Sequence, residues 1–358
     1  MSSAATGMTV LERDLLAAAR RGDEHAYRQL VEPRHAELHA HCYRMLGSVH
    51  DAEDALQDAL LRAWRGLARF EGRSSPRSWL YKIATNTCLD VIARRPKRVL
   101  PLDYAPASDP HDAPSKPLLE SVWIEPYPNE ALGLPSGPAA PDARYEQRES
   151  VELAFIAALQ HLPGLQRAVL ICREVLGFSA QEVADVLDTT VAAVNSALQR
   201  ARKAVAERLP ERSQQATLRT LGDERVRALV EEYMAAWERG DVDAIVALLS
   251  EDAVVTMPPM PTWYRGRDAV ATFLRTWAFA RRWEGSRFVE GERRVRLVPV
   301  RAGGQLAFAA YNWDAERGSL RPYALQVLTL DRARIGEIAG FVTPGVFAGF
   351  GLPDALAP

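Results

Sequence analysis

Hydrophobic residues recur at helical spacing over residues 10–98, with few helix breakers. In the segment 50–70, apolar side chains at positions 56, 60, 63, 64 and 67 predict one buried helix face. A second face with the same spacing carries Asp54, Gln57, Asp58 and Leu61. Because this face is acidic with a single apolar residue, it suits a basic protein partner better than DNA. The alternative is a solvated face with acids near the helix start.

The next helical pattern lies in a basic stretch. Ten Lys and Arg residues fall between Arg62 and Arg98, against two acids. A small polar loop precedes a helix whose polar positions include Lys82 and Asn86. Binding of single-stranded DNA requires cations that pair with the phosphates and aromatic rings that stack on the unstacked bases. The alternative is that Phe70 and Trp79 only fill the core.

Residues 101–149 form a linker that is rich in proline and acidic residues. Fully extended, it could reach roughly 160 Å, whereas about 17 base pairs of DNA span only about 60 Å. A structureless insert of this length is usually functional or disordered. Its centre concentrates Trp123, Ile124 and Tyr127, which favours a docking segment over an unstructured tether, although both remain open.

Residues 150–210 are again helical and end in a helix-turn-helix pattern. Ser179 and Glu182 form a capping-box signature before a short helix, and the turn 188–190 leads into a longer helix. Val191, Val194 and Leu198 are expected in the core. The polar positions of the longer helix can reach base edges or phosphates in a major groove; they are Asn195, Ser196, Gln199, Arg200, Arg202 and Lys203. A helical hairpin with a solvated basic face is the alternative.

Residues 222–350 begin with helical patterns and then alternate between apolar and polar positions, as strands do. The fold class expected for the whole chain is therefore multidomain, with two all-α modules followed by an α+β domain.

The two helical zones resemble regions 2 and 4 of sigma-70 family factors of the extracytoplasmic-function type. DAEDALQDALLRAW and FEGRSSPRSWLYKIATNTCLD carry the likeness to region 2, and TTVAAVNSALQRARKAV carries the likeness to region 4. The resemblance implies region 2 over residues 10–100 and region 4 over residues 150–210. It also implies a function in directing core RNA polymerase to promoters, with the β′ clamp, the β flap and promoter DNA as partners.

The same resemblance assigns roles to particular residues. The exposed acidic face of the 50–70 helix would contact core polymerase through Asp54, Gln57, Asp58 and Leu61. The −10 element would be contacted by Arg77, Lys82, Asn86 and Arg94. The six polar residues of the helix-turn-helix would contact the −35 element.

The C-terminal zone resembles SnoaL-like and ketosteroid-isomerase-like cones. By that resemblance Tyr233 stands at the oxyanion tyrosine and Gln326 near the oxyanion acid, while Met257 replaces the catalytic base. Because methionine cannot accept a proton, we expect no isomerase chemistry. The candidate pocket residues, which would hold a small apolar ligand or merely fill the cone, are Tyr233, Met257, Trp263, Trp277 and Tyr311.

Other features limit the remaining possibilities. A formal net charge of −2 excludes a uniformly basic nucleic-acid coat, and three scattered cysteines predict neither a disulfide framework nor a zinc ribbon. His35, His39 and Cys42 lie at near-helical spacing, which could suggest a metal site, but the acid between the two histidines falls one place late for the zinc-protease pattern. Neither a metal nor another cofactor is expected. Without a signal peptide or a long apolar run, the chain is expected to be cytoplasmic and to have no membrane partner. Two rival hypotheses remain: a helix-turn-helix regulator with a ligand-binding domain, and a bifunctional protein with an active C-terminal enzyme.

Overall fold

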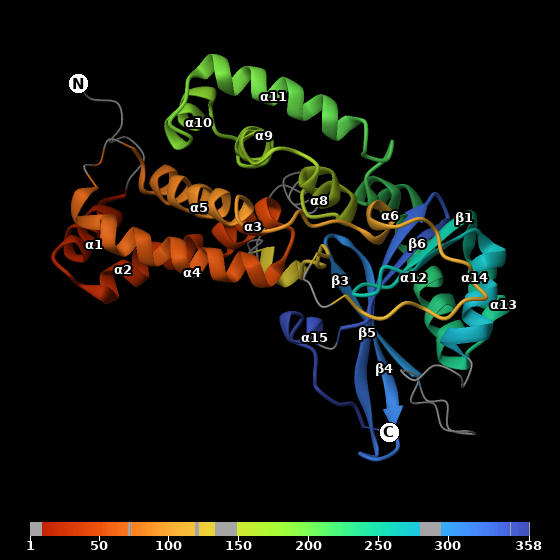
Figure 1. Cartoon of the computed structure of the whole chain (residues 1–358). Coiled ribbons are helices and arrows are strands. Elements are labelled where there is room, and N and C mark those ends of the chain that lie inside the picture. The colour runs from red at the N-terminus through yellow and green to blue at the C-terminus, as the bar shows by residue number, and fades with distance from the viewer. Residues whose placement is uncertain are drawn as a thin grey trace. The chain divides into compact units, whose positions relative to one another are not determined.

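The computed structural model describes residues 9–70, 72, 74–118, 122–132, 149–279, 295–343 and 345–357 (Figure 1). The chain divides into two compact units. The helical unit runs to Arg98 and includes Ala131–Ser150 and Ala154–Leu209. The cone unit comprises Val99–Glu130, Val151–Leu153 and the chain from Pro210 onward. Among the described residues, no helix has both the length and the apolar character needed to cross a membrane.

The first part of the helical unit contains five helices with clear sequence signals at their ends. They are α1 (Val10–Arg20), α2 (Glu24–Val31), α3 (His35–Leu46), α4 (Val49–Gly66) and α5 (Pro76–Ile92). Thr9 and Glu12 cap α1 reciprocally, and Ser48 and Ser75 accept backbone N–H groups at the starts of α4 and α5. Gly47 ends α3 with a φ of 72°, a conformation that glycine adopts without steric cost.

The second part of the helical unit contains the predicted helix-turn-helix. Its elements are α8 (Leu153–Gln160), α9 (Gly164–Leu170), a π-helical turn (Ile171–Val175), α10 (Ala180–Val186) and α11 (Val191–Ala206). Ser179 and Glu182 form the expected capping box, and their backbone hydrogen bond lowers the pKa of the Glu182 carboxyl. Of the three residues expected in the core, Val194 and Leu198 are buried, whereas Val191 in the first turn of α11 is only half-buried.

Buried arginines join the two parts of the helical unit. Arg167 donates to the carbonyl oxygen of Met45, near the end of α3, and to those of Gln160 and Leu162 at 3.1 Å. These carbonyls lie at or just beyond helix C-termini, where a cation is favourable. Arg44 likewise donates through Nη2 to Ser150 Oγ at 2.8 Å. The helical unit is therefore held together by bonds between α3 and the residues around α8 and α9.

The cone unit is built on a six-stranded mixed sheet with strand order β2-β1-β6-β5-β4-β3. The strands are β1 (Leu249–Thr256), β2 (Trp263–Arg265), β3 (Val295–Ala302), β4 (Gln305–Asp314), β5 (Ser319–Asp331) and β6 (Arg334–Phe341). All pairs are antiparallel except β1 with β6. The alternation of apolar and polar positions expected of strands in the C-terminal zone corresponds here to β3, β4 and β5.

Helices pack against the sheet to complete the cone (Figure 1). They are α12 (Gln214–Arg239), α13 (Val242–Ala247) and α14 (Arg267–Phe273), followed by a π-helical turn (Leu274–Ala278) and the short α15 (Val346–Gly349). Gly222, with a φ of 75°, interrupts α12. The core between helices and sheet includes Tyr233, Ile245, Phe273 and Phe308. The linker adds α6 (Pro101–Tyr104) and a 3-10 turn (Asn129–Leu132).

Candidate functional site

The acidic surface of α4 is exposed along its length. Asp54, Gln57 and Asp58 are exposed, and Leu61 is one of the few large apolar side chains at the surface, with 46% of its area accessible. On the opposite side, Leu56 and Ala63 are fully buried. Helical periodicity therefore places the four predicted polymerase-contacting residues on one open face, which we call the α4 surface.

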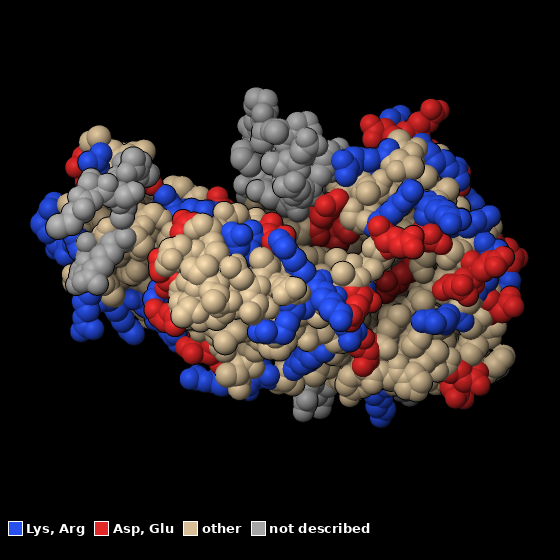
Figure 2. Space-filling model, turned by 90° about the horizontal axis from the view of Figure 1, so that it is seen from above, with Lys and Arg blue, Asp and Glu red and all other residues tan. Residues whose placement is uncertain are grey.

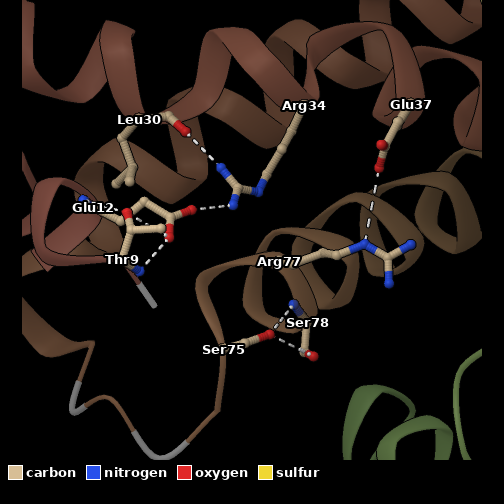
Figure 3. Close-up of polar contacts among 8 residues, drawn as sticks. All are labelled: Thr9, Glu12, Leu30, Arg34, Glu37, Ser75, Arg77 and Ser78. Carbon is tan, nitrogen blue, oxygen red and sulfur yellow. Dashed lines mark hydrogen bonds and ion pairs between the residues drawn. The ribbon is translucent and has the colours of Figure 1, made fainter. Parts of the chain in front are cut away.

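Arg77 lies in the first turn of α5 and is held by three neighbours. Its guanidinium carbon lies 4.8 Å from the ring centre of Phe178 and 5.2 Å from that of Tyr81. Its Nε lies 3.8 Å from Glu37 Oε2 on α3, and Ser75 and Ser78 bond to one another at the helix start (Figure 3). The predicted DNA contact is thus oriented by one carboxylate and two aromatic rings, one of them from the helix-turn-helix part.

Lys82, one turn and a half further along α5, also contacts the helix-turn-helix. Its Nζ donates to Asp188 Oδ1 at 2.5 Å and to the carbonyl oxygen of Asp185 at 3.0 Å. Asp188 adopts a left-handed φ of 49° in the turn before α11. Asn86 is partly exposed on the same helix, and Arg94 is exposed just beyond its end. Of the predicted −10 residues, Arg77 and Lys82 are therefore engaged inside the helical unit.

The outer face of α11 carries the residues predicted to contact the −35 element. All six, Asn195, Ser196, Gln199, Arg200, Arg202 and Lys203, are exposed. Arg202 pairs with Glu174 at 2.7 Å, but both side chains are largely solvent-accessible, so the pair contributes little stability. Figure 2 looks onto the side that carries α11 and shows Lys and Arg side chains there among uncharged surface. An exposed helix with alternating amides and cations can enter a major groove.

The linker segment Val99–Glu130 packs on the cone, and we call its described residues the strap. Three indole N–H groups form hydrogen bonds between strap and cone. Trp123 of the strap donates to the carbonyl oxygen of Pro259 at 2.9 Å. Trp263 of the cone donates to the carbonyl of Ala105 at 2.7 Å, and Trp277 donates to the carbonyl of Pro110 at 3.1 Å.

Backbone bonds extend the same attachment. Ser108 N donates to the Trp263 carbonyl at 2.8 Å, and Leu118 N donates to the Pro259 carbonyl at 3.0 Å. Trp123, Ile124 and Tyr127 are buried, with exposed fractions of 6%, 1% and 0%. The docking interpretation of the linker centre therefore agrees with the structure, and a free tether does not.

The cone also holds the chain on both sides of the helix-turn-helix part. Both carboxylate oxygens of Glu152, which precedes α8, accept backbone N–H groups of Gln214 and Gln215 at 3.0 Å. Leu153 N donates to Gln305 Oε1 at 2.9 Å. Glu152 is 4% exposed, and the backbone N–H groups at the start of α12 hydrogen-bond its carboxyl oxygens at a helix end that favours negative charge. Sequence reasoning assigned no role to these residues.

A cavity of about 80 Å³ opens between the helices and the sheet of the cone. Its described walls are mostly apolar and include Met257, Phe273 and Ala310, and none of the described residues that line it is charged. Of the predicted pocket residues, Met257 lines the cavity, whereas Tyr233 is not part of the lining and bonds to the lining residue Gln326.

The remaining three predicted pocket residues also lie outside the lining of this cavity. Trp263 and Trp277 use their indole N–H groups to hold the strap. Tyr311 donates to the carbonyl of Pro353 at 2.9 Å and packs against Phe347. In each case the N–H or O–H group of the aromatic side chain donates to a backbone carbonyl far away in sequence. This hydrogen bond orients the ring.

The positions that resemble the isomerase site are changed in this chain. Tyr233 Oη donates to Gln326 Oε1 at 2.9 Å, and both side chains are buried. Burial raises the pKa of Tyr233 well above its usual value. Met257, at the position of the base, offers only a thioether to the cavity. The described residues of the cavity therefore contain no group that titrates near neutral pH.

The histidine and cysteine residues of α3 have structural roles. Cys42 is fully buried, and His39 lies 3.6 Å from Glu53. His41 contacts Thr85 Oγ1 at 2.9 Å, and burial lowers its pKa to about 3. Over the part of the chain that the structure describes, no three His, Cys, Asp or Glu side chains come together as a metal site.

Family models match three stretches of the chain: Sigma-70 region 2 over residues 30–98, Sigma-70 region 4 over residues 152–205, and a SnoaL-like domain over residues 230–341. The chain is 40% identical over 353 residues to the "ECF RNA polymerase sigma factor SigG" of Mycobacterium tuberculosis, which covers 95% of this chain and 86% of that protein.

Two further similarities extend these matches. The "ECF RNA polymerase sigma factor SigW" of Bacillus subtilis is 27% identical over 206 residues, which cover 56% of this chain and 98% of that protein. The crystal structure of the extracytoplasmic function sigma factor SigJ of Mycobacterium tuberculosis superposes with a TM-score of 0.54 at 23% identity. That superposition covers 91% of this chain and 99% of SigJ, and it is a likeness of fold.

Proposed function

Because this chain belongs to the extracytoplasmic-function family of sigma factors, we propose that its α4 surface binds core RNA polymerase and that α5 and α11 bind the promoter. The exposure of Asp54, Gln57, Asp58 and Leu61 on one face supports the first part. The exposed amides and cations of α11 support the second. The β′ clamp and the β flap are the proposed polymerase contacts.

We propose further that the helical unit must open before it binds a promoter. Lys82 of α5 bonds to Asp188, three residues before α11 begins. On DNA, −10 and −35 elements separated by about 17 base pairs lie about 60 Å apart. While Lys82 and Asp188 remain in contact, α5 and α11 lie too close together to bind the −10 and −35 elements at the same time. Polymerase or DNA must therefore displace the Lys82–Asp188 pair.

The cone is proposed to modulate this opening in cis. The observation that carries this proposal is the pattern of attachment: the strap follows directly after Arg98, and Glu152 and Pro210 flank the helix-turn-helix part. The cone thus holds the chain next to each promoter-binding module. While the strap is docked, the chain that allows the two promoter-binding modules to separate is shorter than the full linker. The effective concentration of one module at the other depends on that length.

Run-off transcription with core polymerase tests this function. The full-length chain is compared with the double variant Trp123→Phe, Trp263→Phe, which removes one indole donor of the strap and one of the cone but keeps both side chains aromatic. We expect core affinity to stay unchanged and promoter output to change several-fold. Equal output from the two proteins on every promoter fragment would exclude modulation through the strap. Failure of the unmodified chain to support any transcription would exclude promoter recognition itself.

A further inference from the structure

The helical unit contains a hollow of its own, which we call the basic pocket. Its volume is about 280 Å³, and it is lined by the chain around Asp51, by the chain after α5 and by the residues between α8 and α9. Among the described residues that line it, four are cations and one is an acid. The cations are Arg95, Lys97, Arg98 and Arg167, and the acid is Asp51. A hollow lined by an excess of one sign of charge attracts ligands of the opposite sign.

The acid of the basic pocket is already engaged by arginines. Asp51 lies in the first turn of α4 and is 4% exposed. Arg98 donates to Asp51 Oδ2 through Nε at 3.0 Å and through Nη2 at 2.5 Å, and Arg95 pairs with Oδ1. Both carboxylate oxygens are therefore used by cations that precede the linker, and the second part of the unit adds a further cation.

That further cation, Arg167 of α9, is buried with neutral partners. Among the described residues it donates to the carbonyl oxygens of Met45, Gln160 and Leu162 and, at 2.6 Å, to Gln160 Oε1. Its Nε has no hydrogen-bond partner there, although the side chain is only 4% exposed. Burial lowers the pKa of Arg167 to about 10, so the charged form is less favourable here than in water. An anion in the adjoining pocket would compensate this charge.

The mouth of the basic pocket carries two exposed cations. Arg95 and Lys97 follow α5, and Lys97 Nζ lies 2.6 Å from Nδ1 of His161 on the opposite wall. Arginine binds phosphate oxygens in a bidentate manner, and lysine binds them as a point charge. The combination of two exposed cations with a buried arginine is therefore suited to a phosphate group.

The remaining wall of the basic pocket is apolar. Val91, Ile92, Leu162 and Pro163 contribute to it. The volume lies near the lower end of the range for ligand pockets, about 300–1,000 Å³, and exceeds what a single ion needs. A ligand that fills the pocket should accordingly have a small carbon portion beside its anionic group.

We propose that the basic pocket binds a small phosphate monoester, with its phosphate among the cations and its carbon portion against the apolar wall. The pocket exists only while both parts of the helical unit are together. Its preference for a small molecule over the phosphates of promoter DNA rests on the opening proposed above, because promoter binding would separate the two walls. Binding of the monoester itself does not depend on promoter recognition.

Two probes that both carry a tetrahedral head group on a phenyl ring test the proposal. Phenyl phosphate carries a charge of about −1.5 to −2 at neutral pH, whereas benzenesulfonamide is neutral. Affinity for the full-length chain is measured by titration calorimetry, and NMR of labelled histidine rings locates the probe through His161. We expect phenyl phosphate to shift the His161 signals, to bind at least about tenfold more tightly than the sulfonamide and to weaken with added salt.

Lys97→Gln removes an exposed ammonium at the mouth and should weaken phenyl phosphate binding by about tenfold. Lys116→Gln removes an exposed ammonium of the strap, outside the pocket, and is the matched control that should keep the affinity. Should Lys97→Gln fail to fold, the two probes still decide on the unmodified chain.

A short single-stranded oligonucleotide distinguishes the two sources of phosphate. Shifts of His161 with the oligonucleotide but not with phenyl phosphate would assign the pocket to the DNA backbone and overturn the proposal. Equal affinity for the two phenyl probes, or His161 signals that phenyl phosphate leaves unmoved, would overturn it as well. Run-off transcription by the unmodified chain is a separate measurement, so failure of the proposed function is distinguishable from failure of this proposal.

Discussion

The attachment of the strap makes a quantitative prediction about local opening. Trp123→Phe with Trp263→Phe removes two indole donors that form bonds of 2.9 and 2.7 Å to backbone carbonyls. Both tryptophans are 6% exposed, so water does not replace these bonds while the strap stays docked. A buried hydrogen bond contributes about 1 kcal/mol net. Together the two losses should shift strap opening by about 2 kcal/mol, or about 30-fold.

Native-state hydrogen exchange measures this opening directly. The amides of Ser108 and Leu118 donate to carbonyls of the cone and are protected only while the strap is docked. We expect their exchange to accelerate about 30-fold in the double variant, while amides in the centre of β4 keep their protection. Trp64→Phe, which alters a tryptophan of α4 that packs on Tyr27, is the matched control and should leave both strap amides unchanged. Unaltered exchange of Ser108 and Leu118 in the double variant would refute the assignment of these indoles as the ties that hold the strap.

Four further predictions concern the helical unit. Asp58→Lys on the exposed α4 surface should weaken core binding at a stability cost of no more than about 0.5 kcal/mol, whereas Asp14→Lys on exposed α1 should leave affinity unchanged in the same pull-down. Arg200→Ala should weaken −35 binding and, if the arginine contacts a guanine, relax the preference there by about 1–3 kcal/mol, measured by competition between promoter variants; a uniform loss with a shallower salt dependence would instead identify a phosphate contact. Asp188→Asn keeps a residue that tolerates left-handed φ but removes an exposed ion pair worth at most about 1 kcal/mol, so promoter binding should rise by up to about fivefold in filter-binding assays, and a decrease would contradict the closed form. His41 has a pKa of about 3 in the folded chain and binds a proton more readily when unfolded, so its stabilising contribution is complete above about pH 6.5 and is lost progressively towards pH 3. The free energy of unfolding, measured with urea, should fall by about 2 kcal/mol between pH 7 and pH 5. The variant His41→Gln should remove that part of the pH dependence.

The features that could be predicted from sequence are those that local rules determine. The capping box of Ser179 and Glu182 depends on residues three apart, and the exposure of Asp58 depends on helical periodicity alone. The same rules place the α11 residues at the surface. By contrast, β6 contains an arginine, a glutamate and two glycines among its apolar residues, so its sequence lacks the alternation that marks a strand. Its pairing with both β1 and β5 makes it central to the sheet nevertheless.

The contacts that could not be predicted join residues far apart in the chain. Aromatic residues of a cone are expected to fill its interior, and Trp263 and Trp277 carry no local signal that their N–H groups face Ala105 and Pro110. Lys82 likewise lies in a basic segment that is typical of a DNA contact, and only the fold of the helical unit brings it to Asp188. Such pairings depend on the tertiary path of the chain rather than on spacing.

The cavity and the strap share elements of the cone, so a molecule in the cavity would contact residues next to those that hold the strap. Met257 lines the cavity, while the carbonyl of Pro259, two residues later, accepts both Trp123 and Leu118 of the strap. Leu274 and Ala278 also line the cavity, within the π-helical turn from which Trp277 holds the strap. A ligand can shift strap docking only by the difference in its affinity for the docked and released forms. A difference of about 1.4 kcal/mol would change the docked fraction tenfold. The hydrogen-exchange experiment on the strap amides, repeated with 2-butanone as a small apolar probe, therefore tests whether occupancy of the cavity is coupled to the linker. Unchanged exchange at a saturating concentration of the probe would mean that the cavity and the strap are not coupled.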